Sequence, residues 1–78
     1  MMTLKDYFKK SDYLVLDFND KYHIFIDNIC GLCIELCDNI GNSVNIGYDM
    51  DISYDTYVDD IKGVVSDYIL DKYFNTIV

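Results

Sequence analysis

Apolar side chains recur along this chain with two different periods, and the change between them divides the chain into elements. The middle alternates apolar and polar residues and is rich in aromatic and β-branched side chains, which is typical of strands. Turn-forming residues separate these stretches, first at 19–21 and then at 38–42. The pattern predicts four strands in an antiparallel meander, over residues 13–18, 22–27, 31–37 and 44–48.

The two ends of the chain follow a helical period. Near the start, Leu4, Tyr7 and Phe8 lie three to four residues apart, which predicts a short helix over 3–10 capped by Thr3. The second helix is predicted over 54–74, with Ser53 or Asp55 as its N-cap. Gly63 inside this helix suggests close packing by a neighbour, since glycine weakens a helix. The expected buried stripe is Tyr57, Val58, Ile61, Val64, Val65, Tyr68, Ile69 and Tyr73.

These elements define a fold class. A short N-terminal helix, a four-stranded antiparallel sheet and a long C-terminal helix packed on one face of it make an α+β sandwich. Residues 1–78 suffice for one domain. In the second strand Ile24 and Ile26 should face one side of the sheet, and His23, Phe25 and Asp27 the other. In the third strand Leu32, Ile34 and Leu36 should face opposite to Cys33, Glu35 and Cys37.

Charge narrows the range of partners. Fourteen acidic and six basic residues give a net charge of −8, and there is no arginine. Direct binding to nucleic acid or to an anionic membrane is therefore not expected, whereas a basic partner protein is favoured. Solubility alone is the alternative explanation. The residues expected to bind the partner are the acidic side chains of the C-terminal third, interleaved with tyrosines: Asp55, Asp59, Asp60, Asp67 and Asp71.

Neither a signal peptide nor a membrane span is expected from the sequence. The first ten residues hold no apolar run of the necessary length, and no segment approaches the ~20 apolar residues of a span. We therefore expect a cytoplasmic protein and a monomer rather than a dimer. A reducing compartment, together with an odd number of cysteines, argues against a structural disulfide.

Metal chemistry is suggested by one short stretch. His23, Cys30, Cys33 and Cys37 include the single histidine and all three cysteines. One imidazole and three thiolates are the ligand set of a closed, structural zinc site, and Cys30 and Cys33 form a C-x-x-C pair. The sequence therefore predicts structural Zn²⁺. The alternatives are cysteines that act as small buried apolar side chains, or a redox-active C-x-x-C.

Geometry decides between these alternatives. In a fully extended segment, Cys33 and Cys37 lie ~13 Å apart and cannot share an ion bound at ~2.3 Å. A bent or helical segment would bring all three cysteines together. If the segment instead pairs with residues 22–27, His23 faces Cys37 across the ladder and the site is split. Asp27, Glu35 and Asp38 could replace His23 as ligands.

No enzyme is expected. The chain has no glycine-rich phosphate loop and no nucleophile beside its histidine, and Phe25 stands where a zinc deaminase carries its glutamate. A small zinc or redox enzyme using Cys30 and Cys33 is the alternative.

In its size, acidity, αβ layout and His23–Cys30–Cys33–Cys37 motif, the chain resembles the small acidic anti-CRISPR proteins of phages, especially zinc-containing inhibitors of the type II-A RNA-guided nuclease. The resemblance implies binding to the recognition lobe of that nuclease, blocked loading of target DNA, and the cytoplasm of an infected bacterium. The alternative is a regulatory protein with a different partner, because the same sequence features are expected for it.

Overall fold

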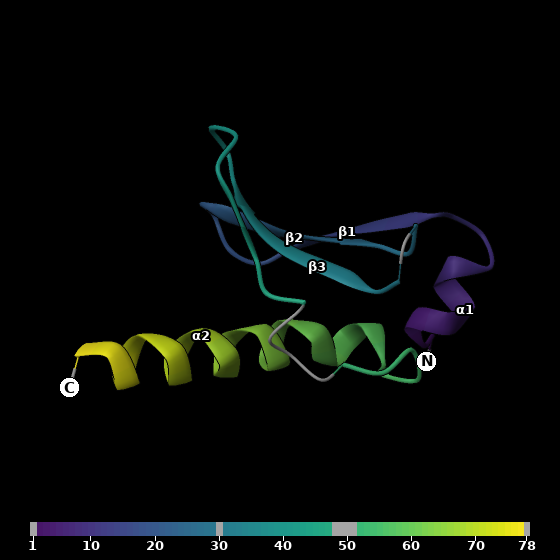
Figure 1. Ribbon diagram of the computed structural model, residues 1–78. Coiled ribbons are helices and arrows are strands. Elements are labelled where there is room, and N and C mark those ends of the chain that lie inside the picture. Colours follow the sequence, from purple (N-terminus) through teal and green to yellow (C-terminus); the bar gives the residue numbers. More distant parts are fainter. Residues whose placement is uncertain (1, 30, 48–51, 78) are drawn as a thin grey trace.

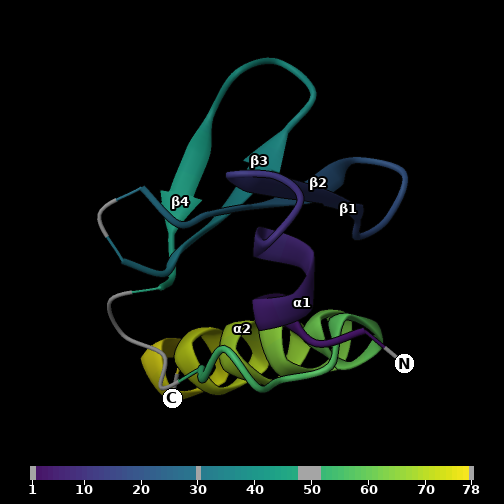
Figure 2. The ribbon, with the colours of Figure 1, turned by 90° about the vertical axis from the view of Figure 1, so that its right-hand side faces the viewer.

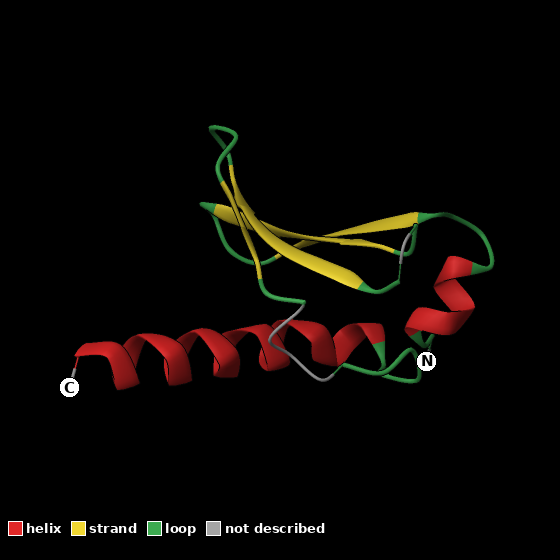
Figure 3. Cartoon of the chain, viewed as in Figure 1, coloured by secondary structure: helices red, strands yellow, loops and turns green. Residues whose placement is uncertain are grey.

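The computed structural model describes residues 2–29, 31–47 and 52–77, with side-chain detail as far as residue 71. The sheet and the last helix form two layers, and the first helix lies at one end between them (Figures 1 and 2). This confirms the predicted α+β class. The elements are α1 (Leu4–Phe8), β1 (Tyr13–Asp17), β2 (Tyr22–Asp27), β3 (Cys33–Asp38), β4 (Ser43–Asn45), a 3-10 helix η1 (Val58–Asp60) and α2 (Ile61–Ile77) (Figure 3).

The sheet is an antiparallel meander in the order β1-β2-β3-β4, as predicted. Its register aligns the buried residues of the three longer strands: Leu14 pairs with Ile26, and Ile26 with Ile34. Because side chains alternate across a strand, this register places one apolar set on a single face. Ile24, Ile26 and Ile34 are all fully buried there.

Side-chain caps close the β1–β2 and β3–β4 turns. Asn19 Oδ1 accepts hydrogen bonds from the N–H groups of Lys21 and Tyr22, at 2.8 and 2.9 Å. Asp38 Oδ1 accepts from the N–H groups of Ile40 and Asn42, at 3.0 and 2.8 Å. Such bonds mimic a backbone turn, which explains the choice of Asn and Asp at these positions.

The core lies between the sheet and the helices. All of its fully buried side chains among the described residues are aliphatic, and no described polar side chain is buried in it. From the helices come Leu4 of α1 and Ile61 and Val65 of α2, each fully buried. Among the described residues, the buried set is Leu4, Leu14, Ile24, Ile26, Ile34, Ile46, Ile61 and Val65.

Two sets of hydrogen bonds hold the first turn of α1: a side-chain cap, and backbone bonds to residues 54–56. Thr3 caps it as predicted, because the Thr3 hydroxyl accepts from the Asp6 N–H at 3.2 Å and Asp6 reaches back to the Thr3 N–H. The N–H groups of Leu4 and Lys5 donate to the carbonyls of Thr56 and Tyr54, at 3.0 and 2.8 Å. A neighbouring segment thus satisfies backbone donors that a helix leaves free.

That same pairing corrects the predicted start of the second helix. Residues 54–57 are not helical: they lie beside the N-terminal segment, and a β-bridge joins Thr3 and Tyr57. The carbonyls of Tyr54 and Thr56 accept from the N–H groups of Lys5 and Leu4 in α1, so these two carbonyls are unavailable for helical bonds. Tyr57 precedes η1 without a side-chain cap, so neither Ser53 nor Asp55 is the N-cap, and Tyr57 itself is 45% exposed. The helix is therefore shorter at its start than predicted.

The glycine expectation is also corrected. A Cβ at Gly63 would meet no described atom within 4 Å, so none of the described residues packs against that position. The close approach occurs at Gly47, where a Cβ would lie 2.6 Å from the backbone nitrogen of Ile34. The N–H groups of Ile46 and Gly47 both donate to the Ile34 carbonyl, which holds the two backbones together. The predicted fourth strand ends at Asn45, and Tyr48 lies outside the described residues.

Candidate binding surfaces and the cysteine–histidine region

The two faces of the sheet differ in what covers them. The helix α2 lies below one face, whereas no described helix lies over the other (Figures 1 and 2). On this outer face the register forms rows across neighbouring strands. One row is Tyr13, Asp27 and Cys33; the next is Val15, Phe25, Glu35 and Asn45; the third is Asp17, His23, Cys37 and Ser43.

The structure brings together two of the four predicted zinc ligands. His23 and Cys37 face each other directly across β2 and β3. Directly paired residues have Cβ atoms about 4.5–5.5 Å apart, which is within reach of one ion.

Cys33 is not part of that pair. It lies four residues from Cys37 in the same extended strand, which separates the two by roughly 13 Å. Cys30 lies outside the described residues. Within the described ranges, no three His, Cys, Asp or Glu side chains could hold a metal ion together. This is the split arrangement that the sequence allowed: His23 meets Cys37, and Cys33 lies apart from both. Structural zinc at these residues stays a prediction.

The two described thiols are set in an acidic environment. Partial burial and the nearby carboxylates of Asp27 and Glu35 raise the pKa of Cys33, against a hydrogen bond that Asn45 Nδ2 donates to Cys33 Sγ at 3.2 Å. Burial, followed by Glu35 and Asp38, raises the pKa of Cys37. A reactive cysteine needs a lowered pKa. The surroundings of both thiols therefore disfavour a nucleophilic or redox role.

The acidic residues expected to bind a partner are all exposed. Asp55 lies in the turn before η1, and Asp59 and Asp60 lie within η1. Asp67 and Asp71 follow in α2. Spacings of seven and four residues place Asp60, Asp67 and Asp71 along one side of the helical segment. The sequence pattern thus becomes a line of carboxylates at the surface.

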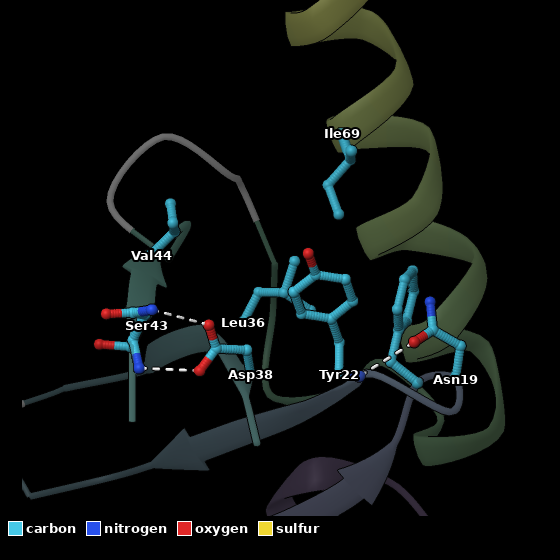
Figure 4. A pocket seen from close by; sticks show the side chains of 9 residues that line it. Asn19, Tyr22, Leu36, Asp38, Ser43, Val44 and Ile69 are labelled. Atoms are coloured by element: carbon cyan, nitrogen blue, oxygen red, sulfur yellow. Dashed lines mark hydrogen bonds between the residues drawn. The ribbon is translucent and has the colours of Figure 1, made fainter. Parts of the chain in front are cut away.

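The β3–β4 hairpin curves away from α2 (Figure 1), and a cleft lies between the hairpin and the helix. Its volume is about 440 Å³. In Figure 4, Ile69 points from α2 toward Tyr22 and Leu36, and Val44 stands on the opposite side. The lining is mostly apolar, with the Asp38 carboxylate at one edge: Phe18, Tyr22, Leu36, Val44 and Ile69.

Sequence reasoning did not find this cleft. Val44 alternates correctly to face the core, but it is 57% exposed, because the hairpin leaves the helix at this point. The alternation of apolar and polar residues predicts toward which face of the sheet a side chain points. It contains no information about how much of that face other elements cover. A hint in the sequence is the polar composition of residues 38–43, which predicts a projecting hairpin tip.

Comparison with known proteins gives no relative: no protein family, curated protein or solved structure matches the chain. No helix among the described residues is long and apolar enough to cross a membrane.

Proposed function

We propose that this protein is an acidic binding protein that inhibits a nucleic-acid-handling protein by occupying its basic surface. The observation that carries the proposal is the line of exposed carboxylates at Asp60, Asp67 and Asp71, in a chain with a net charge of −8. Complementary charge steers association and selects the partner. The resemblance to small acidic anti-CRISPR proteins makes the type II-A RNA-guided nuclease the first partner to test.

The test is binding to that nuclease over a range of salt concentrations. Between about 0.1 M and about 1 M salt the screening length falls from roughly 10 Å to roughly 3 Å, so affinity should fall steeply. Inhibition of target cleavage should fall in parallel. The absence of a complex at low salt would exclude this nuclease as the partner.

A charge-matched pair of variants separates a specific surface from general acidity. The Asp60→Asn/Asp67→Asn variant removes two charges from the line, and Asp12→Asn/Asp20→Asn removes two exposed charges elsewhere. We expect the first variant to bind at least about threefold more weakly than the second at low salt. Equal weakening would mean that net charge, and no particular surface, attracts the partner.

The structural zinc of the sequence prediction is tested separately, by elemental analysis of untagged protein. A four-ligand site requires about one zinc per chain and its loss in both Cys33→Ser and Cys37→Ser. If zinc is retained in Cys33→Ser but lost in Cys37→Ser, the ion lies at the His23–Cys37 pair. Metal-free protein with unchanged stability under chelation would leave the thiols as packed side chains.

A further inference from the structure

We infer that the cleft between the β3–β4 hairpin and α2 takes up a bulky apolar side chain that belongs to a lysine- or arginine-rich segment of the partner protein. The inference rests on the proposed function, because it names the chemistry of the partner segment that the acidic protein recognises. It concerns a surface distinct from the line of aspartates on η1 and α2.

The first argument is the exposed apolar lining of the cleft. Val44 is 57% exposed and Tyr22 is 39% exposed, while Leu36 and Ile69 are half-buried between them. Burial of such surface by a partner is favourable by roughly 25 cal/mol per Å². Interfaces commonly place an aromatic or aliphatic anchor in a pocket of this kind.

The second argument is charge. Asp38 stands at the edge of the cleft, and no basic residue is among the described residues that line it. Asn42 fixes the Asp38 carboxylate by donating from its N–H to Oδ1 at 2.8 Å and from its side-chain amide to Oδ2 at 2.9 Å. A carboxylate fixed beside an apolar pocket favours an apolar side chain with cationic neighbours.

A second hollow on the molecule lacks this combination. It has a similar volume, about 430 Å³, and lies between β1 and the start of α2. Asp17, Asp59 and Lys62 line it, so its lining has the same net charge of −1 as the hairpin cleft, but Lys62 places a cation in the hollow that would repel a basic segment. The cleft at the hairpin is therefore the site that fits a basic segment better.

The third argument concerns the type of occupant. Small-molecule pockets bury about 70–90% of a drug-sized ligand. This cleft has an exposed valine and a partly exposed tyrosine as its walls, so it shields a ligand on only part of its surface. A side chain presented by a protein needs no such enclosure, because the rest of the partner covers the rim.

The experiment uses the full chain and a short peptide with a central tryptophan flanked by two lysines on each side. The protein contains no tryptophan, so the peptide emission reports burial of its indole ring without background. We expect a blue shift on titration, together with backbone amide shifts in nuclear magnetic resonance spectra at Leu36, Val44 and Ile69. Replacing the tryptophan by alanine, or the lysines by glutamates, should weaken binding about tenfold or more.

Two valines provide a matched control for the site. Val44→Arg places a cation in the cleft, while Val15→Arg makes the same change on the outer face of β1, where Val15 is 51% exposed. We expect about tenfold weaker peptide binding for Val44→Arg, native binding for Val15→Arg, and retained binding for Val44→Leu. Circular dichroism and thermal unfolding confirm that each variant is folded.

Three results would overturn the inference: equal weakening by both arginine variants, equal binding of the glutamate-flanked peptide, or binding of free indole as tight as that of the peptide. The last result would make the cleft a small-molecule site.

Failure of the proposed function is distinguishable from failure of the cleft inference. If Asp60→Asn/Asp67→Asn weakens nuclease binding and Val44→Arg does not, the function stands without the cleft. If the nuclease does not bind but the lysine-flanked peptide enters the cleft, the cleft serves another basic partner.

Discussion

The two faces of the sheet differ in how deeply their side chains are buried, although alternate residues of the same strands supply both. On the inner face Ile24, Ile26 and Ile34 are completely buried under α2 and its neighbours. On the outer face Tyr13 and Val15 are 56% and 51% exposed. The inner face holds the fold together, and the outer face is available for chemistry or contact.

The outer face nevertheless has its own order. The rings of Tyr13 and Phe25 stack with centroids 5.7 Å apart, and Asn45 donates to the Cys33 thiol across the β3–β4 pair. Cross-strand pairs of this kind contribute roughly 0.2–1 kcal/mol each. We therefore expect truncation of an inner-face side chain to lower the free energy of unfolding much more than truncation of an outer-face one. Both losses should be measurable.

The largest effect should come from a cavity in the inner face. Ile26→Ala removes a fully buried side chain between Leu14 and Ile34, so we expect a loss of about 2–5 kcal/mol in the free energy of unfolding. Val15→Ala on the outer face should cost less than about 1 kcal/mol. Urea unfolding followed by circular dichroism measures both. Similar losses for the two variants would mean that the outer face is covered in solution.

A smaller effect should separate two glycines. A methyl group at Gly47 would collide with the backbone of β3, so Gly47→Ala should cost about 1–3 kcal/mol. At Gly63 the space is open and the backbone is helical, so Gly63→Ala should stabilise the protein by up to about 1 kcal/mol. Opposite signs in the same unfolding assay are the expected outcome. A destabilising Gly63→Ala would reveal a contact at that side of α2.

The sequence predicted most of the fold because local patterns determine most of it. Alternation in 22–27 and 33–38 and the turn residues Asn19 and Asp38 determine strands, turns and register together. The start of α2 could not be predicted in this way. Residues 54–57 have an amphipathic pattern, but the carbonyls of Tyr54 and Thr56 bond to Lys5 and Leu4. These partners are far away in the sequence, so no local pattern contains the pairing.

The candidate site was predictable only in part, for the same reason. Residue type identified His23 and the cysteines as possible ligands, and spacing allowed either a gathered or a split arrangement. Pairing with β2 determines that His23 meets Cys37 and leaves Cys33 apart. The cleft depends on where the hairpin leaves α2, a tertiary feature with no local pattern of its own.

The smallest expected effect concerns the thiols of the outer face. In the folded protein the pKa values of Cys33 and Cys37 are raised, so both thiols keep their protons at a pH where the unfolded chain has begun to lose them. Stability is therefore fully present below the pKa of the unfolded thiols. It decreases as the pH rises through the folded pKa values.

Glu35 provides the sharpest test of this pH dependence, because it raises the pKa of both thiols and accepts a weak hydrogen bond from Cys33 Sγ at 3.9 Å. In a Cys30→Ser background, Glu35→Gln should move alkylation of both cysteines to lower pH, measured as the iodoacetamide rate at each site by mass spectrometry. Asp17→Asn, on the same outer face, is the charge-matched control and should leave both profiles unchanged. A profile that moves equally in the two variants would show that the overall charge of the outer face, and not the position of Glu35 between the two thiols, sets their reactivity.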